Sequence, residues 1–245
     1  MLSFPALRLG SLLAGLLIAA SVPSDAVAGV LINGTRIVYP AAEREVTVEL
    51  TNKGQTPVLM QAWVDRGDAQ LKPQEADAPF LATPPIFRLD PQKGQSVRLA
   101  FTGEDLPQDR ETLFWFNALE IPPMPQDANG SMMQVAVRSR LKLFYRPSGL
   151  PGDLPSAVGK VNWQVQHQGN GYVLRGENPS PYHISFSTLV LNQGSQSFET
   201  AGGMIPPFSH HDFALPGYSS GNGDTLRFRW MSDFGAAPEQ TIPLH

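Results

Sequence analysis

Two groups of residues in this 245-residue sequence have types and spacing that are associated with catalysis or metal binding. Gly217-Tyr218-Ser219-Ser220-Gly221 matches the G-x-S-x-G pattern of a serine hydrolase, and His210-His211-Asp212 places two imidazoles beside a carboxylate. The serine pattern requires a strand, a sharp turn and a helix around the nucleophile, whereas Asn222-Gly223-Asp224 predicts a loop. Neighbouring residues of a strand point to opposite faces, so the two imidazoles would not converge on a metal ion. We therefore expect no catalytic residue, no metal site and no cofactor.

The composition excludes further classes of function. The chain has no cysteine, which rules out disulfide scaffolds, cysteine-ligated zinc and thiol catalysis. Its 22 acidic residues outnumber its 18 basic residues, whereas a protein that binds nucleic acid needs a basic face. The 22 glycines and 23 prolines exceed average usage, and they predict many turns rather than an all-α protein.

The first 28 residues have the three parts of a secretory signal peptide. Arg8 supplies a positive charge, residues 12–20 form an apolar run, and Ala26-Val27-Ala28 is a cleavage site of small residues. The apolar run is much shorter than the roughly 20 residues that span a bilayer. We expect cleavage after Ala28 and export of the remaining chain.

The elements that must position any functional site are predicted to be short strands. Apolar and polar residues alternate in residues 46–50, 97–101, 133–137, 161–165 and 226–230. Alternation with a period of two indicates a half-buried strand. The proline- and glycine-rich stretch 146–155 cannot continue a central strand. We therefore predict an all-β protein with two immunoglobulin-like β-sandwich domains, at residues 29–148 and 149–245.

One long stretch of the sequence is more informative than any of these patterns. Residues 106–117 read LPQDRETLFWFN, Ile121-Pro122-Pro123 follows, and residues 142–147 read KLFYRP. This combination resembles the periplasmic chaperones of the chaperone–usher pilus pathway, the PapD-like family, with a departure at Ala118 where a larger aliphatic residue is usual. The resemblance covers essentially the whole mature chain and implies two immunoglobulin-like domains arranged as a boomerang. The absence of cysteines and of a long insertion between Pro123 and Met133 points to the short-loop branch.

The resemblance also implies roles for individual residues. Arg36 and Lys142 match the two cations that hold the C-terminal carboxylate of a pilus subunit, and a carboxylate forms charge-assisted hydrogen bonds with such groups. The residues that match the donor strand, which completes the fold of the subunit by strand addition, are Met133, Val135 and Val137. The residues that match a charged trio between the domains are Glu111, Arg146 and Asp233. As a hypothesis, this ionic trio fixes the angle between the domains.

The resemblance further implies a periplasmic, non-enzymatic chaperone that binds, folds and caps pilus subunits. Its expected partners are pilus subunits and an outer-membrane usher, and nucleic acid is not among them. An exposed apolar edge strand invites aggregation, so the donor strand needs to be covered by a flexible loop, the subunit or a second copy. A self-capped homo-oligomer is one of the ways in which the free chaperone would meet this need.

Two alternatives remain open at this point. A secreted two-domain β-sandwich adhesin or carbohydrate-binding module would present aromatic side chains on a flat face and would not need Arg36 or Lys142. A glycoside hydrolase or esterase would need two carboxylates facing one cleft, about 5–10 Å apart. Glu111 and Asp233 are candidates for such a pair, but Arg146 between them would keep both ionised and would deny a general acid.

Overall fold

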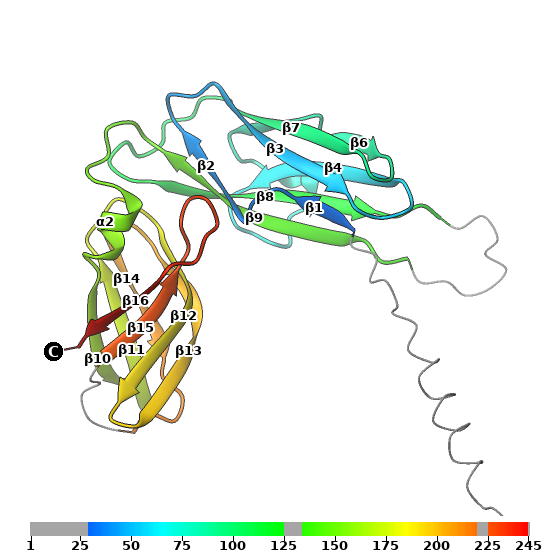
Figure 1. Cartoon of the computed structure of the whole chain (residues 1–245). Helices are drawn as coiled ribbons and strands as arrows, with labels where there is room; N and C mark the ends of the chain where they lie inside the picture. Colours follow the sequence, from blue (N-terminus) through cyan, green and yellow to red (C-terminus); the bar gives the residue numbers. More distant parts are fainter. Residues whose placement is uncertain (1–28, 125–133, 220–224, 245) are drawn as a thin grey trace, which may run out of the picture.

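The computed structural model describes residues 29–124, 134–219 and 225–244, and these fold into two β-sandwiches joined by a bend (Figure 1). The predicted signal peptide and Met133 lie outside the described residues. None of the helices in the described part of the chain has the length and hydropathy that crossing a bilayer requires. The prediction of an all-β protein with two immunoglobulin-like sandwiches is confirmed.

The first sandwich consists of a four-stranded and a five-stranded sheet. The four-stranded sheet has the order β1 (Val30–Ile32), β3 (Glu45–Asn52), β7 (Gly94–Phe101) and β5 (Phe80–Thr83). The five-stranded sheet has the order β2 (Arg36–Pro40), β9 (Val137–Arg146), β8 (Thr112–Ile121), β4 (Val58–Asp65) and β6 (Ile86–Leu89). A short 3-10 helix, η1 (Pro73–Glu75), follows β4.

The second sandwich consists of a three-stranded and a four-stranded sheet. The three-stranded sheet has the order β10 (Asn162–Gln168), β11 (Gly171–Asn178) and β14 (Ser209–Ala214). The four-stranded sheet has the order β13 (Gln196–Ile205), β12 (Ile184–Gln193), β15 (Thr225–Trp230) and β16 (Glu239–Pro243).

Each sandwich has its own hydrophobic core, which the alternation of the strands builds. In the first, Val97 and Leu99 of β7 and Phe116 of β8 are fully buried. In the second, the ring of Trp163 packs against Phe186 at a centroid distance of 5.2 Å. Two separate cores allow the two sandwiches to hold their shapes independently, so a site between them depends on the contacts across the bend.

The proline- and glycine-rich stretch 146–155 leads from β9 toward β10, and the short helix α2 (Leu154–Val158) begins at its end. The Asp153 side chain accepts a hydrogen bond from the Ser156 backbone N–H at 2.8 Å, and proline occupies the first turn, where no donor is lost. Strand β9 ends at Arg146, where this stretch begins, so the prolines of the stretch interrupt no strand.

The expectation of a strand over residues 133–137 is wrong for residues 134–136, because β9 begins at Val137. The neighbouring strand β8 provides the reason. Its last pair with β9 joins Glu120 to Val137, and Pro122 and Pro123 then end β8. Residues 134–136 therefore lie beyond the end of the β8 ladder.

Candidate functional site

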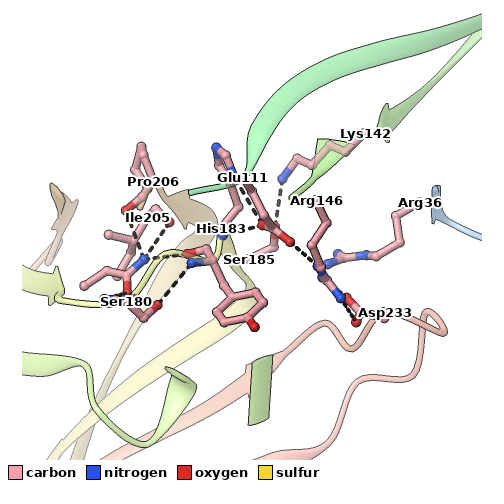
Figure 2. A network of polar contacts seen from close by, with 12 residues as sticks. Arg36, Glu111, Lys142, Arg146, Ser180, His183, Ser185, Ile205, Pro206 and Asp233 are labelled. Atoms are coloured by element: carbon pink, nitrogen blue, oxygen red, sulfur yellow. Dashed lines mark hydrogen bonds and ion pairs between the residues drawn. The ribbon is translucent and has the colours of Figure 1, made fainter. Parts of the chain in front are cut away.

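The two predicted cations lie side by side at the bend. Strands β2 and β9 pair in parallel, and their register places Arg36 directly opposite Lys142. Both side chains reach across to the second sandwich (Figure 2). Arg36 Nη1 donates to the Met231 carbonyl at 3.0 Å, and Lys142 Nζ donates to Ser185 Oγ at 3.1 Å. The site is thus built from one strand pair of the first sandwich and two polar groups of the second.

The electrostatics of this pair favour an anion. Burial and, to a lesser extent, the neighbouring charge of Arg36 together lower the pKa of Lys142 to about 8. Burial also lowers the pKa of Arg36, against the opposing influence of Asp233 and Glu111. Arg36 Nε is buried and has no hydrogen-bond partner among the residues that the structure describes. Two partly desolvated cations with an unused donor would gain from a carboxylate between them.

The predicted charged trio is in contact. Arg146 Nε donates to Glu111 Oε1 at 2.7 Å, and its two terminal nitrogens bind both Asp233 oxygens at 2.7 and 2.9 Å. Burial alone would lower the pKa of Arg146, but the hydrogen bonds and charges of Asp233 and Glu111 outweigh it and raise the pKa. Arg146 is therefore a permanent cation that joins a residue of the first sandwich to a turn of the second.

Glu111 is the most deeply buried member of the trio, with a 3% exposed surface. Its second oxygen accepts the backbone N–H of His183, from the second sandwich, at 2.7 Å. Both carboxylate oxygens are thus occupied at the junction, one by Arg146 and one by the backbone N–H of His183. This arrangement gives no support to Glu111 as a general acid.

The described part of the predicted donor segment is apolar and open. The side chains of Val135 and Val137 are 60% and 53% exposed. Strand β9 pairs with β8 over residues 137–145, but with β2 only over residues 142–146. In the part of the chain that the structure describes, residues 137–141 therefore have no strand on their second edge. An apolar strand with a free edge is suited to pairing with another chain.

A cluster that the sequence did not predict spans β4, β8 and β9, on the face that carries Lys142. We call it the Asp65 cluster, and it consists of Asp65, Asn117, Arg138, Arg140, Trp63 and Trp115. Asp65 is fully buried, and its two oxygens accept hydrogen bonds from Arg140 at 2.7 Å and from Arg138 at 3.1 Å. Each guanidinium also lies over an indole, Arg138 over Trp63 and Arg140 over Trp115. The cluster fixes two long side chains in place beside the site.

Two family models match the two halves of the chain. The description of one is "Pili and flagellar-assembly chaperone, PapD N-terminal domain", over residues 29–151, and the other is "Pili assembly chaperone PapD, C-terminal domain", over residues 156–242. The chain belongs to the PapD family of pilus assembly chaperones. This is a family of chaperones, which is not a class of enzymes.

Individual PapD-family relatives agree with this assignment. The probable fimbrial chaperone YadV of Escherichia coli (strain K12) is 40% identical over 221 residues, which cover 88% of this chain and 90% of YadV. The crystal structure of YadV matches with a TM-score of 0.77 and 37% identity, over 89% of this chain and 100% of that one. A structure of the Salmonella enterica SafA pilin in complex with the SafB chaperone matches with a TM-score of 0.75 and 28% identity, over 88% of this chain and 96% of that one.

The groups that the second domain of this PapD-family chaperone adds to the site could not be recognised from sequence patterns. Ser185 lies between Ile184 and Phe186 in β12, and nothing in that pattern marks its hydroxyl as a partner of Lys142. No sequence pattern marks the carbonyl of Met231 as the acceptor of Arg36 either. For the Asp65 cluster there was a signal, because Arg138, Arg140 and Lys142 alternate along one strand face.

Proposed function

We propose that this chaperone binds, folds and caps pilus subunits by donor-strand complementation and passes them to an outer-membrane usher. Arg36 and Lys142 hold the C-terminal carboxylate of the subunit, and Met133, Val135 and Val137 form the donor strand. The observation that carries the proposal is the parallel register that places Arg36 opposite Lys142, with a buried donor of Arg36 unused. The relative SafB, whose structure is a complex with the SafA pilin, supports a pilus subunit as the partner.

The two contacts complement each other in this mechanism. The carboxylate fixes the end of the subunit strand at Lys142, and the same strand, β9, continues from there to the free edge at residues 137–141. The register of the added strand is thus determined by an ionic contact at one end. Burying one valine side chain of the donor segment in the subunit contributes roughly 1.5–3 kcal/mol before ordering costs.

The ionic trio has a positioning role in the proposal. Arg146, with Glu111 and Asp233, holds the second sandwich at the angle at which Ser185 and Met231 meet the two cations. The proposal includes a signal peptide at residues 1–28 that directs the chain to the periplasm, and domains at residues 29–148 and 149–245. The exposed donor segment and free edge of β9 also support a self-capped homo-oligomer in the absence of subunits.

Co-expression with a pilus subunit of the same locus tests the proposal. The complex is isolated from the periplasm, the mature N-terminus is sequenced, and subunit recovery is compared with that of the double variant Arg36→Ala/Lys142→Ala. The matched control is Arg98→Ala/Arg227→Ala, which removes two cations whose side chains are 57% and 48% exposed. We expect subunit recovery to be lost in the first variant and retained in the control.

Two outcomes would contradict the proposal at different levels. If no subunit is recovered with the unaltered chain, the chaperone does not act on that subunit by this mechanism. If subunit recovery is the same for the unaltered chain and Arg36→Ala/Lys142→Ala, the carboxylate is not held by these cations. A mature N-terminus other than Gly29 would refute the predicted cleavage point.

A further inference from the structure

The turn between β15 and β16, residues 231–236, extends from the second sandwich to the first (Figure 1). Its backbone is closed by hydrogen bonds from Ser232 N–H to the Ala236 carbonyl at 2.8 Å and from Gly235 N–H to the Ser232 carbonyl at 3.0 Å. Gly235 has a φ of +80°, a conformation that a residue with a Cβ rarely adopts. The turn is therefore held in one conformation by its own backbone.

Three contacts fasten this turn to the first sandwich beside the carboxylate site. The Met231 carbonyl accepts the hydrogen bond of Arg36. Asp233 binds Arg146 with both oxygens (Figure 2). At Gly235, a Cβ atom would lie 2.8 Å from the hydroxyl of Thr35, the residue before Arg36. The turn packs so closely on the start of β2 that it forms one wall of the site.

Phe234 stands in the middle of this turn with 96% of its surface exposed. A single exposed apolar residue is common and needs no explanation by itself. Phe234 differs from an isolated exposed residue because both of its neighbours are held in place. Asp233 is bound by Arg146, and Gly235 packs closely against Thr35. A large aromatic side chain on a rigid support loses little conformational entropy when a partner covers it.

We propose that Phe234 is the contact of the second domain with the subunit, packing against an apolar side chain among the last residues of the subunit chain. This inference rests on the proposed binding of the subunit carboxylate between Arg36 and Lys142. The turn that presents Phe234 also provides the hydrogen-bond acceptor of Arg36, so a chain end held by Arg36 arrives next to that turn. The subunit then touches both domains, with its charge on the first and an apolar side chain on the second.

The subunit fits this surface better than a second copy of the chaperone does. The site combines two cations with an aromatic ring, and a chain that ends in a carboxylate preceded by an apolar residue matches both features. Strand addition at residues 137–141 by a second copy would cover β9 but requires no contact at residues 231–236.

Peptide binding with the full-length mature chaperone tests the inference. The probe is a fluorescent synthetic peptide of the last residues of a pilus subunit from the same locus, made with a free carboxylate and, separately, with an amidated end. Phe234→Ala is compared with Leu81→Ala, which truncates another exposed apolar residue, 61% exposed, in β5 of the first sandwich. We expect Phe234→Ala to raise the Kd for the free-carboxylate peptide about tenfold, and Leu81→Ala to leave it unchanged within about twofold.

The results separate this inference from the function on which it rests. Equal affinities for Phe234→Ala and the unaltered chain, together with loss of binding in Arg36→Ala/Lys142→Ala, would overturn the contact at Phe234 and leave the carboxylate site standing. Failure of the unaltered chain to prefer the free carboxylate would overturn both. A change in self-association by Phe234→Ala in analytical ultracentrifugation, with unchanged peptide affinity, would assign the ring to a second copy and also overturn the inference. An unchanged thermal unfolding midpoint establishes that Phe234→Ala is folded.

Discussion

Raising the pH from 7 to 9 is expected to weaken subunit binding about tenfold, because Lys142 loses its proton in the free chaperone over this range. Burial and the charge of Arg36 lower the pKa of Lys142 to about 8. With that pKa, roughly 90% of the free chaperone carries the ammonium at pH 7 and roughly 10% at pH 9. A subunit carboxylate beside Lys142 favours the charged form, so the pKa of Lys142 rises when the subunit binds.

The sign of the effect follows from proton linkage. Above about pH 8 the free chaperone must take up a proton in order to bind the carboxylate, and affinity falls by up to about tenfold for each pH unit until the pKa of the complex is reached. Below that pH Lys142 is already protonated in both states, and affinity is expected to be constant down to the pH at which the subunit carboxylate itself is protonated, near 3.5.

Isothermal titration calorimetry with the free-carboxylate peptide, in buffers of different ionisation enthalpy, measures both the affinity and the proton uptake. The matched control is Lys142→Arg, because a guanidinium stays charged throughout this range. We expect the pH dependence to disappear in Lys142→Arg. An affinity of the unaltered chain that is constant or rises from pH 7 to 9.5 would refute the reasoning, and the same slope in Lys142→Arg would assign the titration to a different group.

Further predictions concern stability and the donor strand. The pKa of Lys142 is lower in the folded chain than in the unfolded one, so folding is favoured as pH rises above 8. Because the buried ammonium is unfavourable at pH 7, Lys142→Met is expected to raise the free energy of unfolding in urea by about 1–2 kcal/mol, after allowance for solvent screening. A loss of stability in this variant would contradict the role of burial. Arg146→Met leaves the buried carboxylate of Glu111 without its cation and is expected to lower the free energy of unfolding by about 3–5 kcal/mol. The control is the double variant Arg146→Met/Glu111→Gln, in which stability is expected to recover, and a single variant as stable as the unaltered chain would refute the argument. Asp65→Asn removes the charge that two arginines share and is expected to cost about 2–3 kcal/mol in the same measurement, an unchanged midpoint being the contrary result. Val137→Asp is expected to reduce subunit recovery from the periplasm while the thermal midpoint stays constant, and full recovery would remove this residue from the donor strand.

Local alternation in the sequence correctly predicted most of the strand segments that it marked. Residues 46–50 lie in β3, residues 97–101 in β7 and residues 226–230 in β15. A period of two records which side of a sheet is buried, and this is a local property of each strand. The pattern failed at residues 134–136, because whether an extended segment becomes a strand depends on a partner, and β8 ends at Ile121. Alternation in one segment carries no information about the length of its neighbour.

The candidate site was predictable only in part. The family resemblance pointed to Arg36 and Lys142, and the register of β2 and β9 brings them together. Ser185 and Met231 were missed because they meet the cations only through the placement of one sandwich on the other, which no local pattern encodes. Asp65 was missed for a similar reason, since its partner Arg140 is 75 residues away in the sequence. Helix α2 was within reach, because Asp153 before Leu154-Pro155 is a readable start signal.

The contacts across the bend connect the carboxylate site to the angle between the domains. Both cations belong to the first sandwich, and both of their acceptors, Ser185 Oγ and the Met231 carbonyl, belong to the second. Asp233, which Arg146 binds, lies two residues after Met231 in the same turn. A change of domain angle would therefore move the acceptor of Arg36 together with the ionic trio.

This connection gives the neutral acceptors a physical role in selecting the ligand. Ser185 and Met231 satisfy one donor of each cation in the free chaperone, but a neutral oxygen forms a weaker hydrogen bond with a cation than a carboxylate does. A subunit carboxylate can therefore displace or supplement these contacts, whereas an amide or a hydroxyl group gains little over what the second domain already supplies. In the proposed function, Arg146 fixes the angle at which the two cations extend toward the junction and meet the charged end of the subunit. On this proposal, the domain junction contributes to binding by favouring a terminal carboxylate over the neutral groups that make up the rest of a polypeptide.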